Sequence, residues 1–167
     1  MGDLFALLSM QQEGRISFIA NVGRGRGRLF VSNLGAAQDP QILADRKISF
    51  VINASKARAY RALPGVTTLT VSIDDDPDAD IAAHFARCID FALPVLNSGH
   101  ALLVHCAAGI SRSVTIAAML LIIHGMTAQS ALQLLRKQRP CANPNPGFAK
   151  KLVMFERLFR QRVTQTR

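Results

Sequence analysis

A thiol and a guanidinium lie close together in the segment VHCAAGISRS, where five residues separate Cys106 from Arg112. Residues 101–104 before them have the length of a buried strand, and residues 114–123 after them are almost wholly apolar and long enough for a buried helix. In a tight loop that opens a helix, backbone N–H groups converge on one point, and the helix N-terminus adds positive potential there. The segment therefore predicts a binding site for an anion.

The residue types in this loop also predict a reaction. A thiol at a helix N-terminus has its pKa lowered to roughly 3.5–7.5 from about 8.5, so we expect Cys106 to be a nucleophile at neutral pH. Gly109 permits a backbone turn where a side chain would block the chain or the ligand. Arg112 offers a planar fork of donors that can bind two phosphate oxygens at once. Together these residues favour nucleophilic attack on a phosphate group.

The composition describes one globular domain. The chain has 167 residues, of which 49% are hydrophobic and 19% charged, and its longest apolar run is shorter than the ~20 residues that span a bilayer. The net charge of +9 favours an anionic partner, without choosing among a phosphate group, a nucleic acid and a membrane surface. Three widely spaced cysteines and the absence of a secretory signal at the N-terminus predict a reducing, cytoplasmic location.

The elements expected around the loop alternate between strands and helices. Strands are expected over residues 29–32, 48–53, 66–73 and 101–104, and helices over 39–46, 79–96, 114–123, 127–139 and 148–162. Asp39 and Thr127 are suited to capping the helices that follow them. This order predicts an α/β fold with a central, mostly parallel, twisted sheet flanked by helices, and a site at the carboxyl end of a strand.

The two ends of the chain lack such patterns. Glycine and arginine alternate from Gly23 to Arg28, and we expect residues 1–27 to form a flexible or loosely packed lead-in. Residues 28–162 are expected to be the catalytic domain and residues 163–167 a tail. The lead-in could be a basic arm that contacts RNA or acidic lipid, or a solvated linker. The lack of interleaved aromatic residues favours the linker.

The segment HCAAGISRS resembles the HCxxGxxR[ST] loop of the cysteine-dependent phosphatases, and most of all that of the dual-specificity protein phosphatases. The segments FVSNLGAAQDP, ISFVINAS and PNPGF, and the acidic stretch before Ala79, resemble the same family in the same order. The resemblance covers about residues 28–160. It implies a protein tyrosine phosphatase-like fold and hydrolysis of phosphotyrosine and phosphoserine or phosphothreonine through a phosphocysteine, with no metal and no cofactor.

The resemblance also implies roles for individual residues. Cys106 would be the nucleophile, Ser113 the hydroxyl that helps the thiolate to leave, and His105 a buried imidazole that fixes the loop and supports the thiolate. His105 could equally be an ordinary core histidine, and Asn145 is expected to have a structural role. The substrate phosphate would be bound by Ala107, Ala108, Gly109, Ile110, Ser111 and Arg112.

The reaction further needs a carboxyl group that protonates the leaving oxygen, and residues 74–78 contain the dense acidic cluster of this chain. Spacing alone does not separate Asp74, Asp75 and Asp76 as candidates. The register of the family selects Asp75 as general acid and base.

Other functions remain as alternatives. The same chemistry could act on an RNA 5′-phosphate or a phosphoinositide, as the net charge of +9 allows, and an inactive phosphopeptide-binding module is the rival of another class. The loop carries no lysine at its variable positions, which favours a phosphoprotein substrate over lipid, and we expect no nucleic-acid partner and no membrane span. The short loop at residues 56–65 predicts a shallow pocket. Cys88 is expected in the core and Cys141 in a loop, and the oligomeric state stays open.

Overall fold

The fold is built on a five-stranded, mostly parallel sheet, as the alternation of elements predicted. The computed structural model describes residues 15–56 and 60–165. The strand order is β1-β2-β5-β3-β4, in which β1 pairs antiparallel with β2 and every other pair is parallel. The strands are β1 (Ile16–Val22), β2 (Gly27–Ser32), β3 (Ile48–Asn53), β4 (Thr67–Thr70) and β5 (Ala101–His105).

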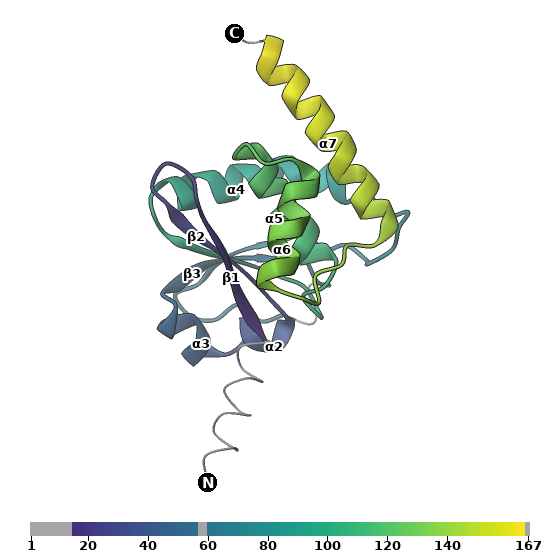
Figure 1. Ribbon diagram of the computed structural model, residues 1–167. Helices are drawn as coiled ribbons and strands as arrows, with labels where there is room; N and C mark the ends of the chain where they lie inside the picture. The colour runs from purple at the N-terminus through teal and green to yellow at the C-terminus, as the bar shows by residue number, and fades with distance from the viewer. Residues whose placement is uncertain (1–14, 57–59, 166–167) are drawn as a thin grey trace.

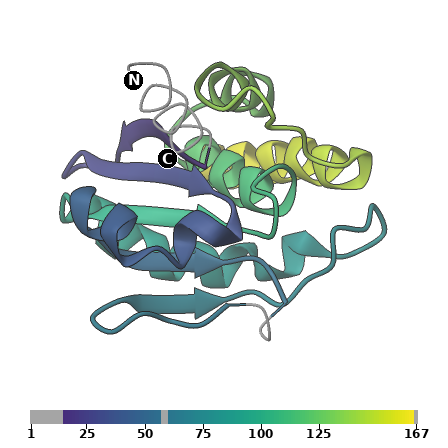
Figure 2. The ribbon, with the colours of Figure 1, turned by 90° about the horizontal axis from the view of Figure 1, so that it is seen from below.

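Helices cover both faces of the sheet (Figures 1 and 2). Side chains of β5 alternate between two cores: Leu102 and Val104 face the larger one, Ala101 and Leu103 the smaller one. The smaller core is covered by α2 (Leu34–Ala37) and α3 (Pro40–Asp45). The larger core is covered by η1 (Ile81–His84), α4 (Phe85–Asn97), α5 (Arg112–Ile123), α6 (Ala128–Gln138) and α7 (Pro146–Gln165).

Local signals in the sequence marked several helix ends correctly. The Asp39 carboxylate accepts hydrogen bonds from the first turn of α3, and the Thr127 hydroxyl accepts one from the N–H of Ser130 in α6. Gly99, after α4, has a left-handed φ of 79°. The strand expected over residues 66–73 is shorter: β4 covers residues 67–70, and after it the N–H of Val71 makes one further hydrogen bond to the carbonyl of Asn53 in β3. No helix in the described parts of the chain is long and apolar enough to cross a bilayer.

Residues 16–27 do not form the flexible or loosely packed lead-in that was expected, because they make a strand and a turn that pack on the domain. Residues 16–22 form β1, whose buried residues Ile16, Ile19 and Val22 recur every third position instead of every second. The pairing register shifts between Phe18 and Ala20, and this bulge hides the alternation by which a strand is recognised in a sequence. Residues 1–14 lie outside the described residues, so the expectation for them is not tested.

The glycines of the Gly23–Arg28 segment serve close packing. A Cβ atom on Gly25 would lie 2.1 Å from the carbonyl oxygen of Asn97, and one on Gly27 would lie 2.5 Å from the Cα of Leu96. Only glycine lets this turn of the β1–β2 hairpin lie directly against the end of α4. The Gly23–Arg28 segment is therefore held against the C-terminal end of α4.

Candidate active site

The loop at residues 106–111 connects β5 to α5 at the carboxyl end of the central strand. All five residues of β5 are buried, which fixes the start of the loop in the core. Residues 113–122 of α5 are buried as well, which fixes its end. Gly109 turns the loop with a left-handed φ of 69°. In this setting the loop N–H groups and the N-terminus of α5 lie at the same edge of the sheet.

The sulfur of Cys106 is buried and surrounded by hydrogen-bond donors. Its residue is 2% exposed, and its Sγ accepts a hydrogen bond of 3.2 Å from the N–H of Gly109. The Oγ of Ser113 lies 3.2 Å from the same sulfur. Burial acts to raise the pKa of this thiol, but hydrogen bonds from the Ser113 hydroxyl and from the N–H groups of Ser113, Gly109 and Ile110 outweigh burial and lower the pKa. The arrangement favours a thiolate.

Arg112 contributes a guanidinium that is only partly satisfied. Its Nη1 donates a hydrogen bond of 3.0 Å to the carbonyl of Ile73, at the start of the segment that leads to the acidic cluster. Its Nε is buried and has no hydrogen-bond partner among the described residues. A buried charged donor without an acceptor is costly, so an anion that supplies an oxygen would be stabilised at this position.

The three candidate acids, Asp74, Asp75 and Asp76, differ in the groups to which their carboxylates bind. Asp74 forms an ion pair of 2.8 Å with Lys56, and the Asp76 carboxylate accepts the N–H of Asp78 at 2.8 Å. Asp75 is exposed, and its Oδ1 accepts a hydrogen bond of 2.8 Å from the side-chain amide of Asn145. Of the three, Asp75 is the one bound to a residue that also contacts the Cys106 loop.

Asn145 joins three parts of the site. Its backbone N–H donates to the Ser111 hydroxyl at 2.9 Å, and its Oδ1 accepts the N–H of Phe148 at 2.9 Å in the first turn of α7. Its Nδ2 holds Asp75. The sequence predicted a supporting role for Asn145 and could not indicate this link, because Asp75 lies 70 positions away.

His105 is buried and packs against a tyrosine. It is 0% exposed, its Nδ1 lies 3.4 Å from the carbonyl of Cys106, and its ring centroid is 4.7 Å from that of Tyr60. Burial lowers the pKa of its imidazole to about 4, against the hydrogen bond to Cys106, which raises the pKa. The ring is therefore neutral at pH 7 and adds no positive charge beside the sulfur.

The remaining loop residues form the rim and the floor of the candidate phosphate site. Ala107, Ala108 and Ile110 are exposed, while Gly109 and Ser111 are buried. Residues 56–65 adjoin the site through Tyr60, and their positions 57–59 lie outside the described residues. Within the described parts of the chain no group of three or more His, Cys, Asp or Glu side chains could hold a metal ion.

Arg139 is a residue whose contribution the sequence did not reveal. In the sequence it is one of several cations at the end of a helical segment, where the helix dipole favours positive charge. In the structure it is 3% exposed and its guanidinium contacts the loop at residues 108 and 109.

The other two cysteines lie apart from this chemistry. Cys88 is buried in the larger core, as expected, and burial raises the pKa of its thiol to about 12. Cys141 is exposed in the loop before α7.

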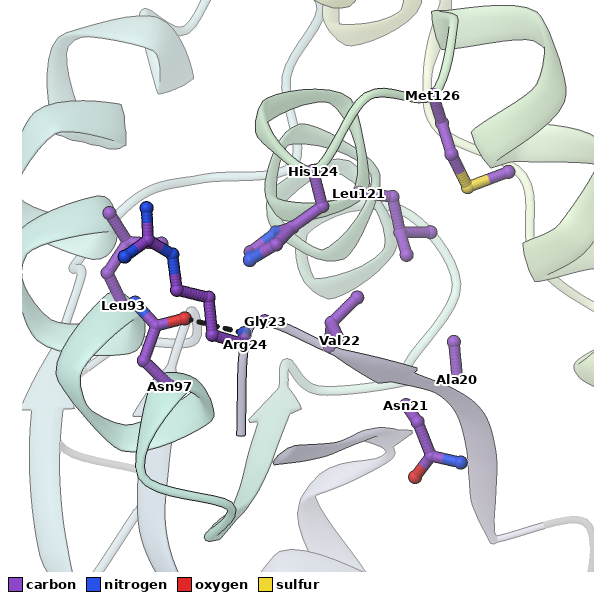
Figure 3. Close-up of a pocket in the computed structure, with 10 residues that line it drawn as sticks. All are labelled: Ala20, Asn21, Val22, Gly23, Arg24, Leu93, Asn97, Leu121, His124 and Met126. Carbon is purple, nitrogen blue, oxygen red and sulfur yellow. Dashed lines mark hydrogen bonds between the residues drawn. The ribbon is translucent and has the colours of Figure 1, made fainter. Parts of the chain in front are cut away.

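A separate cavity of about 560 Å³ lies at the opposite end of the molecule. Figure 3 shows its walls, which come from the β1–β2 turn and from the C-terminal ends of α4 and α5, with Arg24 and His124 among the lining residues. The N–H of Arg24 donates to the side-chain oxygen of Asn97 at 2.9 Å. Because α5 begins at the Cys106 loop and ends at this cavity, about 18 Å of helix separates the two.

Comparisons with known proteins agree on one family. Residues 29–158 match the family described as dual specificity phosphatase, catalytic domain. Dual specificity protein phosphatase 15 of Mus musculus is 38% identical over 128 residues, which cover 76% of this chain and 54% of the relative. Dual specificity protein phosphatase 22 of Homo sapiens is 34% identical over 130 residues, which cover 77% and 70%. This chain spans about half the length of the mouse and rat relatives.

Solved structures are similar over most of the chain. The crystal structure of human DUSP28 aligns with a TM-score of 0.74 at 32% identity and covers 79% of this chain and 90% of its own. The crystal structure of a mouse dual specificity phosphatase complexed with zinc tungstate aligns with a TM-score of 0.80 at 28% identity, covering 90% and 91%.

Proposed function

Because this chain belongs to the dual specificity phosphatase family, we propose that it is a protein phosphatase that hydrolyses phosphotyrosine and phosphoserine or phosphothreonine through a phosphocysteine. The observation that carries the proposal is the surroundings of Cys106. Backbone N–H donors and the Ser113 hydroxyl lower the pKa of its thiol, and the Nε of Arg112 is buried without an acceptor. A phosphate dianion would supply that acceptor. The complex of the similar mouse phosphatase with tungstate, another tetrahedral oxyanion, supports this chemistry.

In the first step the Cys106 thiolate attacks phosphorus in line with the leaving oxygen. The S–P bond forms as the P–O bond breaks, and Asp75 gives its proton to the leaving oxygen. The N–H groups of the loop and the Arg112 guanidinium bind the equatorial oxygens, where negative charge is spread in the transition state.

In the second step water attacks the phosphocysteine. Asp75, now a carboxylate, takes a proton from the water as the new P–O bond forms and the S–P bond breaks. The sulfur leaves as a thiolate and accepts the hydrogen bond of the Ser113 hydroxyl, which lies 3.2 Å away. Inorganic phosphate is released and the enzyme returns to its starting state.

The rim of the site supports a protein substrate. Ala107, Ala108 and Ile110 are exposed and uncharged, so the rim offers apolar contacts in place of the cations that a multiply phosphorylated headgroup would need. The short segment at residues 56–65 supports a shallow pocket that admits phosphoserine and phosphothreonine beside the longer phosphotyrosine. A thiolate nucleophile also requires a reducing compartment, and we place the protein in the cytoplasm.

The test is a substrate panel measured with wild type and Cys106→Ser together. The panel contains phosphotyrosine and phosphothreonine peptides, phosphoinositide vesicles and RNA with a 5′-phosphate or 5′-triphosphate. We expect both peptides to be hydrolysed by wild type, and no turnover by Cys106→Ser, which still binds the phosphopeptides. Hydrolysis by Cys106→Ser would refute the nucleophile assignment.

The same panel separates the alternatives. Turnover confined to lipid or RNA would replace the proposed substrate class while leaving the chemistry intact. Binding of phosphopeptides by wild type without hydrolysis of any substrate, including an aryl phosphate, would identify a binding module instead. Negligible turnover of phosphothreonine beside fast turnover of phosphotyrosine would refute dual specificity.

A further inference from the structure

Every carbonyl oxygen from residue 107 to residue 111 of the Cys106 loop accepts a hydrogen bond from outside the loop. Three of these donors belong to the backbone: the N–H groups of Leu34, Asn143 and Thr115 donate to the carbonyls of residues 107, 110 and 111 at 3.0, 2.8 and 2.9 Å. The two carbonyls in the middle of the loop are held by the side chain of Arg139.

Arg139 reaches the loop from the C-terminal end of α6. Its Nε donates to the carbonyl of Gly109 at 2.7 Å and its Nη2 to the carbonyl of Ala108 at 3.4 Å. Its Nη1 donates to the hydroxyl of Ser17 in β1 at 3.2 Å. With 3% of its surface exposed, the guanidinium makes these hydrogen bonds away from water, where they are strongest.

These two carbonyls belong to the peptide units whose N–H groups donate hydrogen bonds to the Cys106 sulfur. In a planar trans peptide the C=O and the next N–H point in opposite directions. The unit that presents the carbonyl of Ala108 to Arg139 therefore presents the N–H of Gly109 to the opposite side, where it donates to the Cys106 sulfur at 3.2 Å. The next unit presents the carbonyl of Gly109 to Arg139 and the N–H of Ile110 toward the sulfur.

We propose that Arg139 is a positioning residue that fixes the peptide units 108–109 and 109–110 with their N–H groups toward the phosphate site. Its charge also polarises both units, so that each N–H is a stronger donor to the sulfur and to an anion. Arg139 does not touch the substrate. It acts through the backbone of the loop, and its contact with Ser17 connects the loop to edge strand β1.

The packing at Gly109 agrees with this role. A Cβ atom at this position would lie 2.6 Å from the Nη2 of Arg139 and 2.5 Å from the carbonyl oxygen of Ser32. The glycine therefore allows the guanidinium to approach the loop closely, in addition to allowing the left-handed φ of 69°.

The inference rests on the proposed role of Cys106, and three variants test it. Arg139→Ala removes the donors, Arg139→Lys keeps the charge but loses the planar fork, and Arg136→Met removes an exposed cation of α6 as a matched control. Two quantities are measured for each: the pH dependence of Cys106 alkylation by iodoacetamide, read at the Cys106 peptide by mass spectrometry, and the affinity for vanadate.

For Arg139→Ala we expect the midpoint of alkylation to move to higher pH and vanadate affinity to fall by about tenfold or more, because two charge-assisted hydrogen bonds no longer orient the N–H groups. The alkylation midpoint and the vanadate affinity of Arg139→Lys should lie between those of Arg139→Ala and wild type. Both values for Arg136→Met should match wild type. Millimolar guanidinium ion should restore part of the vanadate affinity of Arg139→Ala. A purely structural arginine would show no such rescue at constant melting temperature.

Two results would overturn the inference. One is a folded Arg139→Ala whose alkylation midpoint and vanadate affinity match those of wild type. The other is equal losses in Arg139→Ala and Arg136→Met, since these would reflect net charge alone. If Arg139→Ala does not fold, the test is made with Arg139→Lys. A higher alkylation midpoint and a lower vanadate affinity than wild type would support the inference, and wild-type values would overturn it. A wild-type Cys106 that reacts no faster than the exposed Cys141 would instead refute the proposed function.

Discussion

Uncharged donors surround the sulfur of Cys106, and the neighbouring imidazole does not supply a charge. The pKa of the thiol is lowered by a hydroxyl and by backbone N–H groups against the opposing effect of burial. Burial lowers the pKa of His105 to about 4, so its ring is neutral at pH 7. The reactivity of Cys106 therefore depends on how the loop is folded more than on a single neighbouring cation.

Replacing Ser113 with alanine should change both the ionisation of Cys106 and the second step of the reaction. The thiolate is the reactive form, so the alkylation rate falls as pH falls through the thiol pKa. Losing the hydroxyl raises that pKa and moves the midpoint of alkylation to higher pH. Loss of one hydrogen bond to the leaving thiolate should also slow breakdown of the phosphocysteine by about 10- to 100-fold.

A pre-steady-state burst with an aryl phosphate checks the second effect, because the phosphocysteine of Ser113→Ala should accumulate. Ser130→Ala removes an exposed serine of α6 and serves as control. A Ser113→Ala enzyme with an unchanged alkylation profile and no burst would contradict the role of the hydroxyl.

Asp75→Asn should abolish general acid catalysis while the nucleophile stays intact. For phenyl phosphate, whose leaving group needs a proton, we expect kcat to fall by about 10²- to 10⁴-fold. For an aryl phosphate with a strongly acidic phenol the loss should be much smaller. Asp74→Asn and Asp76→Asn are the matched controls, since their carboxylates bind Lys56 and the N–H of Asp78 instead. A loss independent of the leaving group would exclude Asp75 as the acid.

The buried imidazole of His105 should make stability depend on pH. Its pKa is about 4 in the folded protein and 6.5 unfolded, so the unfolded chain binds the proton more tightly. The stability of the folded protein is therefore at its full value above pH 6.5 with respect to this group. As pH falls towards 4, protonation of His105 in the unfolded chain lowers the free energy of unfolding by up to about 3 kcal/mol. Denaturant unfolding between pH 7 and 4 should show a flatter dependence for His105→Gln than for wild type. His100→Gln, at an exposed position, should follow wild type.

At the scale of elements, the first turn of α7 contacts both the Cys106 loop and the acidic segment. Asn145, just before this helix, contacts Ser111 of the Cys106 loop and Asp75 of the acidic segment. Gly147, inside the turn, lies so close to the acidic segment that a Cβ atom would be 1.8 Å from the carbonyl oxygen of Pro77. The start of α7 thus sets the position of the acidic segment relative to Cys106.

Gly147→Ala should therefore impair catalysis without changing the nucleophile. The added methyl group must push Pro77 away, and displacement of Asp75 by about 1 Å can cost up to about 100-fold in kcat. Alkylation of Cys106 should keep its wild-type rate, which separates this effect from a general loss of folding. Pro146→Ala, at an exposed position in the same turn, is the control. Equal loss of kcat in both variants would argue against the packing explanation.

Sequence patterns predicted the elements wherever the determining residues are neighbours. The capping residues Asp39 and Thr127, and the order of strand, loop and helix around Cys106, are local signals of this kind. The family resemblance extended them to the class of fold and to candidates for the site, but not to the order of the strands in the sheet.

What the sequence did not predict depends on distant contacts. The bulge in β1 disrupts its periodicity, so an edge strand was taken for a lead-in. Arg139 contacts a carbonyl 30 positions earlier, and Asn145 contacts a carboxylate 70 positions earlier. No local pattern distinguishes such a buried arginine from a solvated one at a helix end, because its burial is decided by tertiary packing.

At the scale of the whole molecule, the two ends of α5 differ in role. Its N-terminus lies beside Cys106, and its C-terminus borders the cavity beside the β1–β2 turn (Figure 3). The chain has 20 basic and 11 acidic residues. Its basic residues include the arginines of that turn and also Lys56 and Arg61, on the segment that packs against His105 through Tyr60. The basic charge is thus spread over both ends of the molecule and should act on an anionic substrate mainly as a field.

The net charge of +9 should accelerate the approach of anions to Cys106 in a salt-dependent way. Two alkylating reagents of nearly the same size isolate the field, because iodoacetate is an anion and iodoacetamide is neutral. Between about 0.01 M and about 1 M salt the Debye length falls from about 30 Å to about 3 Å. Over that range we expect the rate of Cys106 carboxymethylation by iodoacetate to fall several-fold, while the iodoacetamide rate stays nearly constant. At low salt Arg61→Gln, next in the chain to the Tyr60 that packs against His105, should slow iodoacetate more than Arg24→Gln, at the far cavity, although both remove one charge. Parallel salt dependences for the two reagents would mean that the basic surface does not steer anions to this site.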